Sequence, residues 1–271
     1  MIRRPSALQI LGTILFAFLF VFFVGGVWSY YLLLNLRTSP SYPWCVAAMG
    51  LALCILWLYL SGGWGPRKTA EYRARALRAH PLPARTFLAA VVAGLCAVVS
   101  LAGLWIVFSR LSSIPIHPLP DFSRYPIVTV ALVLVMAALV NAVAEEAAFR
   151  GYVQGTLERR FGGLIAIAAT ALLMAPAHGL TQGFAWQVVV FYFLIDVVLG
   201  ALAYMTNSIL PGIFVHAAGL LLFFTVIWPA GAVRYTLSEG VAVFAIFGAI
   251  AIAAFLQLRR VSLLDGIVAA A

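Results

Sequence analysis

The candidates for a chemical role in this sequence are a few ionisable side chains that lie within otherwise apolar segments. One such segment contains Glu145, Glu146 and Arg150, and two later segments contain His178 and His216. An ionisable side chain at membrane depth is energetically costly, so each is by default a hypothesis about function. Carboxylates and imidazoles together can hold and activate a water molecule, which predicts hydrolytic chemistry.

The two adjacent glutamates are predicted to differ in role. On a regular helix, Glu146 and Arg150 are four residues apart and can form an ion pair. Glu145 points about 100° away from that pair and shares its face with Asn141. We therefore predict that Glu146 and Arg150 hold the helix, while Glu145 is free for chemistry. The alternative is that the three charged residues only cap the cytoplasmic end of a shorter span.

His178 is predicted to lie at the same depth as Glu145. A glycine-containing turn at residues 161–163 predicts two antiparallel helices. Glu145 lies sixteen residues before residue 161 and His178 seventeen residues after it, so both are roughly 25 Å from the turn. His216 lies about two turns inside its own segment. A lone histidine is more often an interfacial or core residue, but one level with an unpaired glutamate is a better candidate.

Two hydrolytic mechanisms fit these residues. In the first, Glu145, His178 and His216 are the three protein ligands of one divalent metal such as zinc, which keeps an open position for water. In the second, no metal is used, Glu145 is the general base, and the imidazoles hold water or stabilise the oxyanion. The sequence leaves both open. It contains no HExxH, GxSxG or Walker motif, which removes several other hydrolase classes.

The elements that must position these residues are membrane-spanning helices. Hydrophobic residues make up 65% of the chain and charged residues 9%, and a soluble domain cannot bury so much apolar surface. We predict an all-α fold, a polytopic membrane bundle of about eight transmembrane helices. The predicted spans are 9–35, 45–63, 86–109, 126–160, 163–179, 186–205, 209–229 and 240–257.

The distribution of basic residues predicts the orientation of the chain. With the N-terminus in the cytoplasm, thirteen of the seventeen Lys and Arg residues fall on the cytoplasmic side and four on the other, as the positive-inside rule requires. We therefore predict that both termini are cytoplasmic. This pattern accounts for the net charge of +9 without a nucleic-acid partner. The basic stretch 65–85 is either a solvated loop or an interfacial helix that touches anionic lipid or a substrate tail.

Three motifs in this sequence resemble those of a known family. Residues 145–151, EEAAFRG, fit the motif EExxxR followed by Gly; His178 fits FxxxH with Met174 in place of Phe; His216 fits HxxxN with Leu220 at the polar position. The chain resembles the CPBP family, which contains the type II CAAX prenyl endopeptidases and the bacteriocin-processing and abortive-infection intramembrane proteases.

The resemblance covers about residues 126–222 and implies an intramembrane endopeptidase. By this resemblance Glu145 activates water, Glu146 and Arg150 shape the helix of the first motif, and His178 and His216 complete the site. The implied domains are an N-terminal group of three helices with the basic loop, a catalytic core of four helices, and a last helix with its tail; their bounds are 1–125, 126–230 and 231–271.

The departure at Leu220 bears on activity. It removes a side chain that would donate a hydrogen bond to water or to the oxyanion, and the loss of one such donor commonly lowers the rate by ~10²–10³. Asn141, one turn from Glu145, and Asp196, on a neighbouring helix, are the two candidates to replace it.

We therefore predict a multi-pass protein of a bacterial inner membrane that cleaves a membrane-associated protein or peptide. Its partners are this substrate and the lipid bilayer, and no nucleic acid. The cofactor is one divalent metal such as zinc, or none. Two alternatives are a catalytically inactive scaffold of the same family and a transporter, which also places ionisable residues inside helices.

Overall fold

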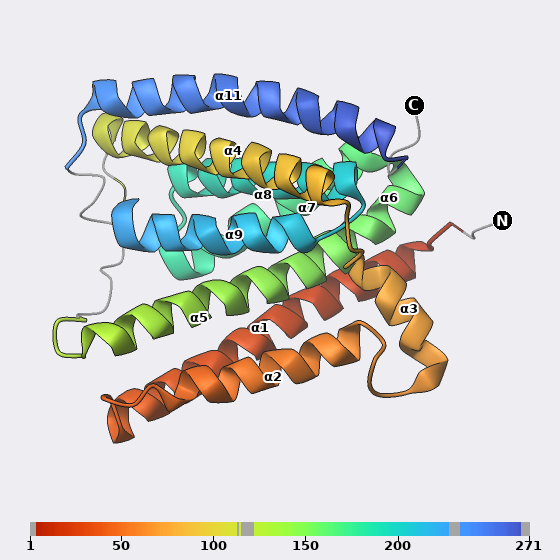
Figure 1. Cartoon of the computed structure of the whole chain (residues 1–271), viewed down its shortest axis with the longest axis horizontal. Helices are drawn as coiled ribbons and strands as arrows, with labels where there is room; N and C mark the ends of the chain where they lie inside the picture. The colour runs from red at the N-terminus through yellow and green to blue at the C-terminus, as the bar shows by residue number, and fades with distance from the viewer. Residues whose placement is uncertain (1–3, 113, 115–121, 228–233, 267–271) are drawn as a thin grey trace.

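The computed structural model describes residues 4–112, 114, 122–227 and 234–266, and over these residues the fold is a helical bundle without strands (Figure 1). Seven continuous helical stretches in the described part are long and apolar enough to cross a membrane, and a shorter apolar helix of 17 residues adds an eighth. The predicted polytopic all-α bundle is therefore confirmed. Six predicted spans each correspond to one α-helix, whereas 126–160 and 209–229 are each divided between α-helix and π-helix, with residues 228 and 229 outside the described residues.

The helices follow one another with short connections. Their bounds are α1 Ala7–Thr38, α2 Trp44–Leu60, α3 Arg67–Leu77, α4 Ala84–Leu111, α5 Ile127–Glu145, the π-helix η1 Glu146–Gln154, α6 Gly155–Phe161, α7 Gly163–Gln182, α8 Trp186–Thr206, α9 Leu210–Leu222, the π-helix η2 Phe223–Ile227 and α11 Leu237–Leu264.

The predicted turn between the two motif-bearing helices is present at Gly162. This residue has φ 82° and ψ 168° and joins α6 to α7, a conformation that glycine adopts without the steric cost that a Cβ would add. The next glycine packs closely, because a Cβ on Gly163 would lie 2.2 Å from the ring of Tyr204 on α8. The α6–α7 turn is thus fixed against α8.

Helix α4 and helix α11, from opposite ends of the chain, pack along each other (Figure 1). A Cβ on Gly103 would lie 2.5 Å from the backbone nitrogen of Phe244, so only glycine allows this approach. The hydroxyl of Ser100 donates to the carbonyl of Phe244 at 2.8 Å. Helix α4 also packs on α8 and α9, so this pair supports one side of the helices that carry the motifs.

Helix α1 lies against α5 and η1, which contain the first motif. The rings of Phe18 and Phe149 meet edge to face, with centroids 5.1 Å apart. Few side chains of α1 are buried, and large apolar ones such as Phe22 and Phe23 are exposed, as expected of a helix that faces lipid.

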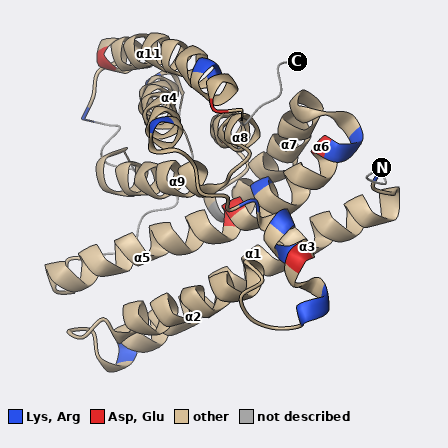
Figure 2. Ribbon diagram, turned by 45° about the vertical axis from the view of Figure 1, so that its right-hand side comes forward, with Lys and Arg blue, Asp and Glu red and all other residues tan. Residues whose placement is uncertain are grey.

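Helix α1 begins and α11 ends at the same end of the bundle (Figure 1). Figure 2 shows basic residues on α3 and α6 at this end. The basic stretch predicted as a loop or interfacial helix contains the helix α3, whose Arg73 is buried while Arg75 is exposed.

Candidate active site

The first motif lies where α5 passes into the π-helix η1. The prediction of one unbroken α-helix over 126–160 is wrong in its middle, because Glu146–Gln154 forms η1. A π-helix closes i→i+5 hydrogen bonds and winds more loosely than an α-helix, and such segments occur frequently at functional sites. All nine residues of η1 are buried, including the polar series Glu146, Arg150 and Gln154.

Arg150 is completely buried between two carboxylates. Its Nε lies 3.6 Å from Oε1 of Glu146, and its Nη2 donates to Oδ1 of Asp196 on α8. The predicted pair of Glu146 and Arg150 is therefore present, and Asp196 is a second counter-ion. Sequence reasoning did not assign this role to Asp196, although a lone acidic residue within an apolar helix signals that a cation must lie nearby.

Glu146 has a further contact that the sequence did not predict. Its Oε1 lies 3.0 Å from Nδ1 of His216 on α9. One turn before His216, a Cβ on Gly212 would lie 2.7 Å from Oε2 of Glu146, so glycine there makes room for the carboxylate. Glu146 therefore contacts both Arg150 on its own helix and the imidazole of His216 on α9.

The orientation of the imidazole follows from this contact. In the tautomer that carries a proton on Nδ1, His216 donates a hydrogen bond from Nδ1 to the Glu146 carboxylate. The other ring nitrogen, Nε2, faces Oε2 of Glu145 at 3.8 Å, which is too far for a direct hydrogen bond. Oε2 of Glu145 is buried and has no hydrogen-bond partner among the described residues. The Glu145 side chain is 11% exposed and lines the same cavity as His216.

His178, on α7, lies flat against an aromatic ring of α8. Its imidazole stacks on Tyr192 with ring centroids 3.8 Å apart and an interplanar angle of 15°. The Tyr192 hydroxyl in turn contacts the amide of Gln182. Glu145, His178 and His216 all line one cavity of about 700 Å³, so three predicted site residues from three helices meet there.

The cavity reaches the outside of the bundle along α1. Phe22, Gly26 and Ser29 of this helix line the cavity and are also exposed. They lie within a helix long and apolar enough to span the bilayer, so the cavity is open toward lipid. Its other lining residues include Asn141 and Leu220.

The described residues do not form a ready-made metal centre. They contain no group of three or more His, Cys, Asp or Glu side chains close enough to hold one ion. Nδ1 of His216 is engaged by Glu146, which leaves Nε2 facing Glu145, and the ring of His178 is stacked on Tyr192. Glu145, His178 and His216 are thus not gathered around one point in this arrangement, and the chemistry proposed for them uses the side chains alone.

Comparison with known proteins identifies the part of the chain that contains this site. Residues 127–222 match the sequence model of the family described as type II CAAX prenyl endopeptidase Rce1-like. The match runs from α5 to the end of α9. No curated protein and no solved structure matches the chain. Over residues 127–222 the chain is therefore similar to the type II CAAX prenyl endopeptidases, a group within the CPBP family that its motifs resemble.

Proposed function

We propose that this protein is an intramembrane endopeptidase that hydrolyses a peptide bond of a membrane-associated protein or peptide, with Glu145 as the base. The observation that carries this proposal is the carboxylate of Glu145, which lines the cavity, faces Nε2 of His216 at 3.8 Å and has one oxygen, Oε2, without a hydrogen-bond partner among the described residues. The Glu145 side chain is 11% exposed, whereas that of Glu146 is fully buried and its Oε1 contacts Arg150 and His216.

The reaction proceeds by attack of water on the peptide carbonyl. Glu145 takes a proton from the water as the water oxygen bonds to the carbonyl carbon. When the tetrahedral intermediate collapses and the C–N bond breaks, Glu145 gives this proton to the leaving amine. His216 holds the water at Nε2 and, when that nitrogen is protonated, donates to the oxygen of the tetrahedral intermediate. Glu146 and Arg150 keep the imidazole in this orientation.

A second donor to the oxyanion comes from Asn141. This residue lies on α5 one turn before Glu145, lines the cavity, and makes no hydrogen bond to another described residue. Asp196, the other candidate, accepts from Arg150 and is an acceptor rather than a donor. Leu220, one turn after His216, lines the same cavity and has no polar group. The side-chain amide of Asn141 therefore takes over the function of the polar residue that Leu220 replaces.

The bound segment of the substrate is apolar and enters from the membrane. The cavity opens along α1 within the span, and aromatic side chains such as Phe18, Phe191 and Phe223 form much of its wall. Both termini face the cytoplasm of a bacterial inner membrane, a proposal that the basic residues on α3 and α6 support.

Leu220 also favours a second candidate function, an inactive scaffold that binds a membrane partner. The test is cleavage of a panel of apolar transmembrane peptides by the protein in lipid vesicles, with products identified by mass spectrometry. Cleavage at defined bonds, absent in the Glu145→Gln/His216→Ala double variant, supports the endopeptidase. Peptides that bind without cleavage would favour the scaffold. Activity abolished by a zinc chelator and restored by zinc would contradict the metal-free chemistry.

A further inference from the structure

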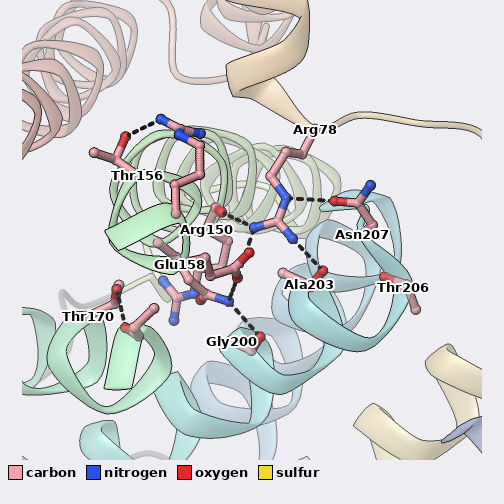
Figure 3. Close-up of polar contacts among 12 residues, drawn as sticks. Arg78, Arg150, Thr156, Glu158, Thr170, Gly200, Ala203, Thr206 and Asn207 are labelled. Carbon is pink, nitrogen blue, oxygen red and sulfur yellow. Dashed lines mark hydrogen bonds and ion pairs between the residues drawn. The ribbon is translucent and has the colours of Figure 1, made fainter. Parts of the chain in front are cut away.

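Arg78, in the connection between α3 and α4, extends its guanidinium into the core of the bundle. It is 6% exposed, and Figure 3 shows it between η1, α6 and α8. Its Nη1 donates to the carbonyl of Arg150 at 3.3 Å and to Oε1 of Glu158 at 3.1 Å, and its Nη2 donates to the carbonyl of Ala203 at 3.0 Å. The side chain therefore joins the motif helix to α8.

The same residue also fixes the start of α9. Its Nε donates to Oδ1 of Asn207 at 3.3 Å, and its carbonyl accepts from the backbone N–H of Ile209 at 3.0 Å. Arg78 and Asn207 are the non-glycine residues with positive φ among the described residues, at 56° and 48°. Two residues in this uncommon conformation thus contact each other where the α3–α4 and α8–α9 connections meet.

Two further contacts extend this junction along η1 and α8 toward the site. Nε2 of Gln154 donates to Oε1 of Glu158 and to the carbonyl of Gly200, each at 2.9 Å. One turn further along both helices, Arg150 donates to Asp196. The contacts of Arg78, Gln154 and Arg150 therefore form three successive links between η1–α6 and α8, and the last of these arginines touches Glu146.

From this geometry we infer that Arg78 is a positioning residue: it sets the relative placement of η1 and α9, and thereby the approach of Glu146 and Glu145 to His216. The inference rests on the proposed function for its effect on cleavage. Glu145 ends α5, Glu146 begins η1 and His216 lies on α9, so a residue bound to η1 and to the start of α9 controls the distances between them. Arg78 lies outside the segment that matches the family.

A matched control is present on α3, five residues before Arg78. Arg73 is 4% exposed and donates to carbonyls of Tyr59, Trp64 and Pro66, which all belong to α2 or to the connection before α3. Arg73 is thus about as buried as Arg78 and makes a similar set of hydrogen bonds, but its carbonyl acceptors all lie within residues 59–66. Replacement of either arginine by lysine removes the planar fork and keeps the charge.

The experiment compares Arg78→Lys and Arg73→Lys in lipid vesicles. For Arg78→Lys we expect kcat to fall by ~10²-fold, the typical cost of a small misplacement of catalytic groups, with KM nearly unchanged because no cavity-lining residue is touched. Arg73→Lys should keep both constants. Asn207→Gly removes one acceptor while tolerating the positive φ, so it should lower kcat in the same direction by a smaller factor.

A second readout does not depend on proteolysis. In protein labelled with ¹⁵N-histidine, with signals assigned from His216→Gln, the chemical shifts of the His216 ring nitrogens report the hydrogen bond to Glu146. We expect Arg78→Lys to change these shifts and Arg73→Lys to leave them alone. Unchanged shifts and unchanged kcat in a folded Arg78→Lys protein overturn the inference, as do equal effects of both variants. If the wild-type protein cleaves no peptide but Arg78→Lys still changes the chemical shifts of the His216 ring nitrogens, only the proposed function is refuted.

Discussion

The imidazole of His216 is held at hydrogen-bond distance by Glu146, not by the neighbouring Glu145. Nδ1 of His216 lies 3.0 Å from Glu146, whereas Nε2 lies 3.8 Å from Glu145. The two adjacent carboxylates therefore act on opposite sides of one ring. Glu146 fixes its orientation, and Glu145 faces the nitrogen that can contact a reacting water.

Glu146→Gln is expected to lower both stability and activity. The variant leaves Arg150 with Asp196 as its remaining counter-ion, and breaking a buried ion pair by removing one partner costs about 3 kcal/mol or more. The amide can accept from or donate to Nδ1, so it no longer selects the Nδ1–H tautomer of His216, and kcat should fall by ~10² or more even in molecules that stay folded. Thermal melts and cleavage rates measure the two effects; a variant with normal kcat would show that the contact with His216 is not used.

Asn141→Ala is expected to lower kcat by ~10²–10³, the usual loss for one oxyanion donor. The second change Leu220→Asn should restore much of this rate, because it places an amide in the same cavity one turn after His216. Steady-state rates of the single and double variants form the test. A simple packing role for Asn141 would leave the double variant no faster than Asn141→Ala.

Gly212→Ala is expected to displace the carboxylate of Glu146, because the added methyl group would lie 2.7 Å from Oε2. Overpacking of this kind costs about 1–3 kcal/mol, and kcat should fall because His216 loses its support. Gly12→Ala is the control: a Cβ there meets nothing within 4 Å, and alanine is the better helix former by up to about 1 kcal/mol. Equal melting temperatures and rates for both variants would contradict the proposed fit.

Reporter fusions test the orientation. Fusions to the N-terminus and after Ala271 should both report the cytoplasm, as the thirteen-to-four distribution of basic residues predicts. A fusion in the connection between α4 and α5 should report the opposite side. A periplasmic signal from either terminus would refute the proposed orientation.

The sequence predicted the helices and the turn at Gly162 because these depend on local features: long apolar runs and a glycine at a positive φ. It also selected Glu145, His178 and His216, which line one cavity, and Glu146 and Arg150, which do not, since costly polar groups in apolar segments are few. It did not predict η1, the contact between Glu146 and His216, or the pair of Arg150 and Asp196. These depend on how helices rotate against one another when they pack, and hydropathy periodicity gives no information on that rotation.

Arg78 shows the same limit most clearly. In the sequence it is one of several arginines in a basic stretch, and the rule for basic residues near span ends accounts for all of them equally. Only the fold separates Arg78, which reaches η1 and α8, from Arg73, which contacts its own connection.

The most direct measurement is the cleavage rate of Glu145→Gln relative to the wild-type protein, with the thermal melt of both recorded in the same vesicles. Glutamine keeps the volume of the side chain and cannot accept the proton of the attacking water. We expect a melting temperature close to that of the wild-type protein and a loss of measurable turnover. Substantial cleavage by a folded Glu145→Gln protein would show that Glu145 is not the base.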